Sequence, residues 1–376
     1  MKTDVLVVGG GIVGCAIAER LARDGVAVCL VERDTLGGAA TAASMGHLVV
    51  LDDDPEELSL SAYSCARWSA FAGALPAAAE YRRIGTLWIA RNDAELAEAE
   101  RKRERLASAG IASEPVSAAQ LRLLEPALTP TLAGGLHVPG DAVVYPPVAA
   151  TWFAQRAAAA GAQIRCGVGV AAIGDRDVLL ADGSRIAARD IVVANGCAAP
   201  ELLAGVPVRK RKGHLLVTTR AQPGVRHQLV ELGYMQSAHG TNTESVAFNV
   251  QPRPTGQLLL GSTRQFDDHA TDVTPRLLQR LIARATEFLP GLAQMTALRA
   301  WTGFRPTTPD HRPLIGAWPL RPGVWLACGH EGLGVTTALG TADLLAAQLL
   351  GTSLPFDARP YAPSRFVATS EVSHAH

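Results

Sequence analysis

The chain has 376 residues, of which 48% are hydrophobic, and it carries 35 basic and 35 acidic side chains. A chain of this length can bury a large core and is expected to form two domains. Because the charges balance, no overall field would attract nucleic acid or an anionic membrane, so we expect a small-molecule partner and no nucleic acid. The six cysteines form no CxxC pair and no Cys/His cluster, so we expect no metal site.

The N-terminal segment has the strand, glycine turn, helix and second strand of a dinucleotide-binding βαβ unit. Gly9 would allow the tight turn, Gly11 would let backbone N–H groups approach a pyrophosphate, and Gly14 would let the helix pack closely on the sheet. Glu32, at the end of the second strand, would accept hydrogen bonds from a ribose. An ordinary structural turn is the alternative for the glycines alone. The acid favours FAD or NAD over NADP, and the adjacent Arg33 weakens that preference.

Charged side chains interrupt the predicted first helix, at Glu19, Arg20, Arg23 and Asp24. Neither a signal peptide nor a membrane-spanning helix fits such a cluster. We therefore expect a cytoplasmic chain without a transmembrane segment.

The next segments predict a loop and then helices around one strand. Residues 36–47 are rich in Gly, Ala, Ser and Thr, which is typical of backbone lying against a ligand or of a flexible loop. The pattern that follows predicts a helix over residues 54–79, a strand over 85–90 and a charged helix over 93–109. Ser117 is expected to cap another short helix.

The middle of the chain predicts two kinds of sheet. The β-branched run at residues 190–194 predicts a buried parallel strand. It ends in Asn195-Gly196, which is typical of a second backbone contact near a cofactor or of a plain strand-to-helix turn. From residue 210 to residue 301 the alternation predicts an antiparallel sheet, with one helix over 275–288.

The last predicted strand, residues 324–328, breaks at the glycine-rich turn 329–334 and leads into an apolar helix over 335–350. This turn, the run 192–196, the segment 303–310 and the N-terminal glycine motif with Glu32 span almost the whole chain in order. In this order they resemble the D-amino-acid oxidase (DAO) family of FAD-dependent amine oxidoreductases, which includes glycine oxidase and sarcosine oxidase.

Within that family, the absence of extra domains and the segment Ser44-Met45-Gly46-His47 look most like the FAD subunits of D-hydroxyproline dehydrogenase, opine oxidase and hydrogen cyanide synthase. The resemblance implies the α/β class, with a Rossmann-like FAD-binding domain interleaved with an α+β substrate domain built on an antiparallel sheet. The FAD domain would comprise residues 1–80, 146–209 and 303–364, the substrate domain residues 81–145 and 210–302, and residues 365–376 would form a disordered tail.

The resemblance also implies where FAD binds. Residues 332–336, at a helix N-terminus, would face N1 and the C2 carbonyl of the flavin, where N–H dipoles stabilise the negative charge of the reduced ring. Sarcosine oxidases attach their flavin through a Cys before the Thr-Pro-Asp segment, and Gly303 and Arg305 stand there instead, so FAD should be non-covalent. The expected cofactor contacts are Gly9, Gly11, Ile12, Val13, Gly14, Glu32, Arg33, Ala43, Ser44, Met45, Gly46, His47, Val170, Ala194, Asn195, Gly196, Arg305, Gly329, His330, Gly332, Leu333, Gly334, Val335 and Thr336.

Chemistry in the family is hydride transfer from the Cα–H of an amine to flavin N5, so the protein mainly orients the substrate. Arg305 matches the position that binds the substrate carboxylate, for which a planar guanidinium is suited. A structural ion pair with Asp310 is the alternative. Tyr234 and His47 are the other catalytic candidates.

Single turn residues have simpler interpretations too. A lone histidine such as His47 or His330 is more often a hydrogen-bonded part of the scaffold than a proton shuttle. The simpler interpretation of Glu331 is a charge at a helix end with no further role.

The electron acceptor is expected to be something other than oxygen. Sarcosine oxidases carry a Lys that promotes the reaction with oxygen, and Leu333 stands at the matching position here. The chain has no Cys framework for an iron–sulfur cluster, so a partner subunit with such a cluster, or a quinone, would take the electrons and could hold the chain at the inner membrane surface.

The resulting prediction is FAD-dependent dehydrogenation of a D-configured or secondary amino acid such as D-hydroxyproline. A glycine or D-amino-acid oxidase that produces hydrogen peroxide is the close alternative. A flavin-binding assembly subunit and an NAD-linked dehydrogenase are the others.

Overall fold

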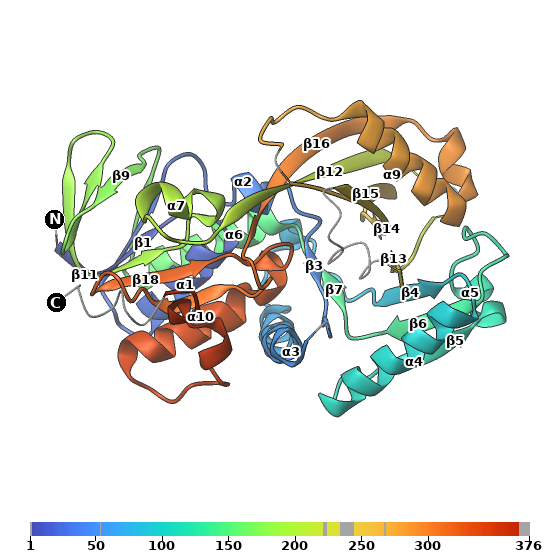
Figure 1. Ribbon diagram of the computed structural model, residues 1–376, viewed down its shortest axis with the longest axis horizontal. Helices are drawn as coiled ribbons and strands as arrows, with labels where there is room; N and C mark the ends of the chain where they lie inside the picture. Colours follow the sequence, from blue (N-terminus) through green and yellow to red (C-terminus); the bar gives the residue numbers. More distant parts are fainter. Residues whose placement is uncertain (1, 53, 221–223, 234–243, 267, 368–376) are drawn as a thin grey trace.

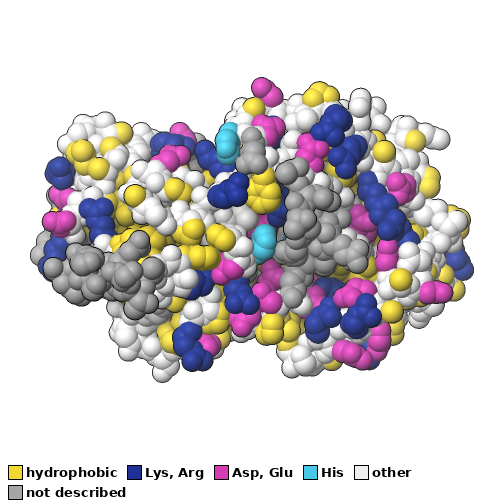
Figure 2. Space-filling model, viewed as in Figure 1, with side chains coloured by type: hydrophobic (Ala, Val, Ile, Leu, Met, Phe, Trp, Pro, Cys, Tyr) yellow, Lys and Arg dark blue, Asp and Glu magenta, His cyan; other side chains and the backbone are white. Residues whose placement is uncertain are grey.

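The computed structural model describes residues 2–52, 54–220, 224–233, 244–266 and 268–367. Two lobes lie side by side, each built on one large sheet (Figure 1). Acidic and basic side chains are interspersed over the face shown in Figure 2, in keeping with the balanced net charge. In the described part of the chain, no helix is long and apolar enough to cross a membrane.

The first lobe contains a mainly parallel sheet. Its strands, in spatial order, are β17 (Leu314–Ala317), β18 (Val324–Cys328), β11 (Arg185–Val193), β1 (Lys2–Val8), β2 (Val28–Glu32) and β8 (Gln163–Cys166), and a hairpin of β9 (Val170–Ile173) and β10 (Asp177–Leu180) pairs with β11. The pairs from β18 to β8 are parallel, whereas β17 and the hairpin are antiparallel.

Both faces of this sheet are buried, because successive residues of its strands point to opposite sides. Val5 and Val7 pack with the helices α1 (Ile12–Arg23), α3 (Pro55–Phe71), α6 (Pro146–Ala159) and α10 (Gly334–Leu350). Leu6 and Val8 pack on the other face with β9, β10 and the segment that follows α7 (Ala199–Leu202). Trp68 of α3 donates from Nε1 to the Val335 carbonyl at 3.1 Å, which fixes the first turn of α10.

The second lobe contains a mainly antiparallel sheet. Its strands, in spatial order, are β16 (Ala297–Thr307), β12 (Arg209–Arg220), β15 (Gln257–Gln265), β14 (Glu244–Pro252), β13 (Gln228–Glu231), β4 (Thr86–Ala90), β6 (Gly134–Val138) and β5 (Glu114–Ser117). Helix α9 (Pro275–Phe288) covers one face, where Phe248 and Phe288 stack with ring centroids 4.2 Å apart. Helices α4 (Asp93–Ser108) and α5 (Ala118–Leu124) flank β5 and β6, and a small sheet of β3 (His47–Leu48) and β7 (Ala142–Val143) lies between the lobes.

The predicted fold class is confirmed, and the differences are local. The helix predicted over residues 54–79 begins as expected, with the Glu57 N–H donating to Asp54 Oδ1 at 2.7 Å, but it ends at Phe71. Gly73 and Pro76 explain the early end, because glycine destabilises a helix and proline cannot continue one. Residues 77–79 form only a 3-10 turn. Ser117 caps α5 in a capping box, as predicted.

The second sheet is mainly antiparallel, as predicted, and β13 and β4 form a parallel pair within it. One further expectation was wrong. The disordered tail was predicted to start at residue 365, but Arg365 is ordered. It lies in a 3-10 turn and donates from Nε to Asp310 Oδ2 at 2.7 Å. Residues 368–376 lie outside the described residues. The domain boundaries remain a proposal, and β16 crosses the boundary proposed at residue 303.

Candidate active site

A cavity of about 950 Å³ lies between the two lobes. Its first-lobe walls are the glycine turn after β1, the segment 43–47 and the residues that follow β11. Its second-lobe wall is formed by β12, β14, β15 and β16. Its volume is at the upper end of the range for ligand and cofactor sites.

The three glycines of the N-terminal motif have different surroundings. Gly9 has φ +107° and lies so close to β11 that an added Cβ would come within 2.8 Å of the Ala194 carbonyl oxygen. A Cβ on Gly14 would overlap the carbonyl oxygen of Gly9, so this residue permits close packing of helix on turn. A Cβ on Gly11 would meet only Thr41 Oγ1, at 3.3 Å, and would otherwise enter the cavity. The space over Gly11 therefore fits a pyrophosphate at the N-terminus of α1.

Glu32 lies at the carboxyl end of β2 and lines the same cavity. It accepts hydrogen bonds from the Gly10 N–H at 2.6 Å and from the Asp34 N–H at 2.8 Å, which hold its carboxylate in place. Arg33 is largely exposed and pairs with Asp34 at 3.2 Å. A fixed carboxylate beside the glycine turn is suited to a ribose.

Two buried polar atoms of the first lobe line the cavity and have no hydrogen-bond partner among the described residues. They are His47 Nε2 and Asn195 Oδ1. Burial lowers the pKa of His47 to about 3, so its ring is neutral. Native proteins rarely leave buried polar atoms unpaired, and because these two residues line the cavity, a bound group could supply their partners. Together with the glycine turn and Glu32, these atoms fit FAD.

Most of the predicted cofactor residues line this cavity, and four do not: Gly14, Gly329, Leu333 and Thr336. Thr336 instead donates from Oγ1 to the His47 carbonyl at 2.8 Å. Leu333 was predicted to lie beside the flavin, but its side chain packs with the apolar cluster around Trp88 because the turn directs it away from the cavity. Tyr234 lies outside the described residues.

Arg305 extends from β16 into the space between the second sheet and the turn 329–334. Its Nη1 donates to the Thr263 carbonyl at 3.0 Å. Glycines on two sides leave room for it: a Cβ on Gly213 would overlap the guanidinium, and one on Gly332 would lie 3.6 Å from Nε. The predicted alternative, an ion pair with Asp310, is wrong for the described structure, since Asp310 pairs with Arg365.

Glu331 is more than a helix-terminal charge. This residue, with φ +47°, accepts hydrogen bonds from Arg211 Nη1 at 2.5 Å and from His311 Nδ1 at 2.8 Å. Burial alone would raise its pKa, but the His311 hydrogen bond and the Arg211 and Arg264 charges hold the pKa of Glu331 at about 2. The ion cluster therefore ties the turn before α10 to β12. Arg211 lies far away in the sequence, so no local pattern could reveal this contact.

The His311 contact predicts a pH-dependent stability. The hydrogen bond to Glu331 raises the pKa of His311, although burial opposes it. A raised folded-state pKa stabilises the fold fully below the unfolded value of about 6.5, and this contribution is lost as the pH rises through the folded value. We expect His311→Gln to lower the unfolding free energy at pH 5.5 and to have a smaller effect at pH 9. An effect that grows with pH, in denaturant titrations at several pH values, would contradict this assignment.

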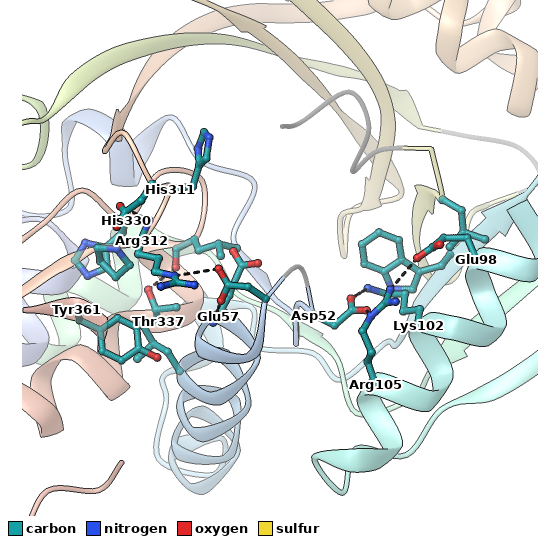
Figure 3. A pocket seen from close by; sticks show the side chains of 17 residues that line it. Asp52, Glu57, Glu98, Lys102, Arg105, His311, Arg312, His330, Thr337 and Tyr361 are labelled. Carbon is teal, nitrogen blue, oxygen red and sulfur yellow. Dashed lines mark hydrogen bonds and ion pairs between the residues drawn. The ribbon is translucent and has the colours of Figure 1, made fainter. Parts of the chain in front are cut away.

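A second cavity, of about 590 Å³, is lined by His330 and Leu333 of the turn 329–334, and Figure 3 shows the side chains around it. Charged side chains gather at its two ends: Arg312 pairs with Asp54 at 3.1 Å, and Lys102 forms a buried ion pair with Asp52. His330 lines both cavities, and its Nε2 contacts Thr341 Oγ1 at 2.9 Å. Burial lowers the pKa of His330 to about 4. Its geometry is that of a neutral, hydrogen-bonded scaffold residue.

The second lobe adds cavity residues that were absent from the predicted site. Asn249, Ser262, Leu215 and Trp301 line the cavity from four neighbouring strands. The alternation of the sequence predicted strands here, but it carried no signal that distinguished these positions from others on the same face. Only the pairing of distant strands brings them together.

Comparison with known proteins is consistent with this geometry. The chain is 30% identical over 98% of its length to the bifunctional protein ThiO/ThiG of Synechocystis sp., and spans 55% of that protein. It is 27% identical to the glycine oxidase of Geobacillus kaustophilus, covering 97% of this chain and 98% of that one. The crystal structure of glycine oxidase from Geobacillus kaustophilus superposes with a TM-score of 0.87 at 25% identity, over 98% of this chain and 100% of that one.

Iminodiacetate oxidase from Chelativorans sp. gives a TM-score of 0.82 at 26% identity, over 96% of this chain and 98% of that one. Residues 4–348 match the DAO family, described as FAD dependent oxidoreductase. That match covers both lobes and every segment that lines the cavity between them. The chain therefore belongs to the DAO family of FAD-dependent oxidoreductases, and its cofactor is FAD.

Proposed function

We propose that the chain oxidises the carbon–nitrogen bond of a D-configured or secondary amino acid, such as D-hydroxyproline. The observation that supports this most directly is the position of Arg305, which lines the cofactor cavity beside Gly332. A guanidinium there would bind the substrate carboxylate bidentately and so fix the orientation of the adjacent Cα. The relatives include proteins named glycine oxidase and iminodiacetate oxidase, after a primary and a secondary amino acid, which supports an amino-acid substrate.

Each described side chain would have a separate task. When bound, FAD would supply the hydride-accepting chemistry, and the protein would supply the orientation and the surroundings. Gly11 and the N-terminus of α1 would hold the pyrophosphate, and Glu32 the ribose. His47, which is neutral, would act as a hydrogen-bond partner through Nε2 and not as a cation. The N-terminus of α10, at Gly334, would stabilise negative charge that builds up nearby.

We propose that the FAD is held without a covalent bond. Cys197 and Cys328 are the cysteines that line the cavity among the described residues. Burial raises the pKa of both thiols to about 12, so neither provides the thiolate that a covalent attachment needs. Acid precipitation of the purified protein is expected to release the flavin into the supernatant. Flavin that stays with the precipitated polypeptide would contradict this.

We propose that the electron acceptor is not oxygen. It would be either a partner subunit with an iron–sulfur cluster or a quinone. The turn 329–334 has Leu333 where sarcosine oxidases have a lysine, and this side chain lies in an apolar cluster. We expect the enzyme to reduce an artificial dye faster than it produces peroxide. Substrate oxidation measured with the dye under nitrogen and with air alone tests this. Turnover with oxygen that matches or exceeds the dye rate would favour the second candidate, a glycine or D-amino-acid oxidase, which the glycine oxidase relatives support.

A flavin-binding assembly subunit is the remaining alternative, and a substrate screen separates it from an enzyme. The screen uses the isolated chain, a dye acceptor and a panel of glycine, D-amino acids, L-amino acids and secondary amino acids. Oxidation of a D-configured or secondary amino acid by the isolated chain is the expected result. If no amino acid is oxidised, the proposed function is wrong.

A further inference from the structure

The second-lobe wall of the cofactor cavity carries a row of residues that cofactor binding does not explain. In the strand register Asn249 of β14 lies opposite Gly261 of β15, and Leu215 of β12 lies opposite Trp301 of β16. A Cβ on Gly261 would lie 2.9 Å from Leu215 Cδ2, so the two pairs adjoin. Asn249, Leu215 and Trp301 all line the cavity. The row thus crosses four strands on the face that looks toward the first lobe.

Two polar atoms in this row have no hydrogen-bond partner within the described part of the structure. Asn249 is 5% exposed, and its Oδ1 is buried and unpaired. The Nε1 of Trp301 is likewise buried and unpaired. An amide oxygen is an acceptor and an indole N–H is only a donor. Native proteins rarely leave such atoms without a partner, and because both residues line the cavity, a ligand there could supply a group of the opposite kind to each.

The space between these two atoms is apolar and adjoins Arg305. Met45, Leu215 and Leu259 form a small cluster against which Trp301 packs. At the other side, Arg305 donates to the Thr263 carbonyl. Thr263 and Gly261 are two residues apart in β15, so their Cα atoms are at most about 7 Å apart. Asn249 lies opposite Gly261 and is therefore close to the Arg305 guanidinium, which is bound to Thr263. Trp301 lies farther away, on the other side of the apolar cluster.

We infer that this row is the subsite for the substrate nitrogen and side chain, an inference that rests on the proposed function. With its carboxylate on Arg305, the substrate donates from its nitrogen to Asn249 Oδ1. Its side chain lies over Met45 and Leu215 and accepts a hydrogen bond from Trp301 Nε1. The substrate class is then an amino acid whose side chain carries an oxygen acceptor, a hydroxyl or a carboxylate, and glycine is a poor substrate.

Trp301→Phe tests the side-chain part of this inference, because it keeps an aromatic ring and removes the donor. The measurement is kcat/KM with dye for D-proline, 4-hydroxy-D-proline and D-glutamate, which separate an unsubstituted side chain, a hydroxyl and a carboxylate. We expect the wild type to prefer one of the oxygen-bearing substrates by about tenfold or more, and Trp301→Phe to bring that ratio close to one. Trp152→Phe, in α6 and outside both cavities, is the matched control and should leave the ratio unchanged.

Asn249→Leu tests the nitrogen contact and has a readout besides turnover. This variant should lower kcat/KM for all three amino acids by about tenfold with the flavin content unchanged. Tetrahydrofuran-2-carboxylate has a ring oxygen where proline has its N–H, so Asn249→Leu should not weaken its binding. The dissociation constant of this probe is read from the change that it causes in the flavin absorbance.

The outcomes distinguish this inference from the function on which it rests. A substrate ratio that Trp301→Phe leaves unchanged would overturn the side-chain assignment. If either variant loses flavin while the ratio of the kcat/KM values for the substrates stays unchanged, the two atoms belong to cofactor binding and the inferred subsite is wrong. A wild type that oxidises amino acids but does not distinguish the three substrates would reject the inference and leave the proposed function in place. A wild type that oxidises no amino acid would reject both.

Discussion

Replacing Arg305 by alanine is expected to lower kcat/KM by about one and a half to four decades while the protein keeps its flavin. The loss of a buried, charge-assisted pair with a carboxylate costs roughly 2 to 5 kcal/mol, and each 1.4 kcal/mol is about one decade. Arg305→Lys should recover only part of the activity, because an ammonium cannot reproduce the two parallel hydrogen bonds of a guanidinium. Steady-state kinetics with a dye acceptor, normalised to bound flavin, provide the measurement.

Two further variants make this result specific. Gly213→Ala changes no charge, but its Cβ would overlap the Arg305 guanidinium, so it should also lower kcat/KM. Arg280→Ala removes the same charge from the exposed side of α9 and should have no effect. If Arg305→Ala loses flavin or unfolds while turnover per bound flavin stays normal, Arg305 is structural and the carboxylate is bound elsewhere.

Replacing Gly11 by valine is expected to abolish flavin binding without unfolding the chain. In the structure a Cβ at this position meets only Thr41 Oγ1, so the protein itself tolerates the added atoms. The rest of the side chain enters the cavity at the N-terminus of α1, where the pyrophosphate must approach the backbone. The purified variant should be colourless, with the circular dichroism of a folded protein.

Neighbouring glycines provide the contrast. Gly14→Ala would overlap the Gly9 carbonyl oxygen and should destabilise the fold together with flavin binding. Gly73→Val, just beyond α3, has open space around it and should keep both the fold and the flavin. A Gly11→Val protein that retains a full complement of flavin would place the pyrophosphate away from this turn.

Local sequence patterns identified much of the first lobe but little of the second-lobe wall. The glycine turn, Glu32 and the long apolar runs are each encoded within a few residues, so periodicity and turn chemistry were sufficient. Asn249 and Trp301 meet only because β14, β15, β12 and β16 pair side by side. An alternating pattern shows that such strands exist, but it leaves their order and register open.

The turn before α10 shows the same limit. The sequence predicts a glycine-rich turn before an apolar helix, but it does not predict the directions of the side chains in that turn. Glu331 has a positive φ and turns toward Arg211, while Leu333 turns toward the second cavity. Both directions depend on partners that lie more than a hundred residues away in the sequence. The helix predicted to run to residue 79 ends early for a local reason instead, because Gly73 and Pro76 stop it although the stretch is rich in alanine.

The most direct test of the central claim is anaerobic reduction of the bound flavin by substrate. The purified chain is mixed without oxygen or dye with members of the amino-acid panel, and the visible absorbance of the oxidised flavin is followed. Bleaching by a D-configured or secondary amino acid, which is slowed in Arg305→Ala and restored by adding dye, is the result that we predict. A flavin that stays oxidised with every amino acid, although dithionite reduces it, would contradict the proposed function.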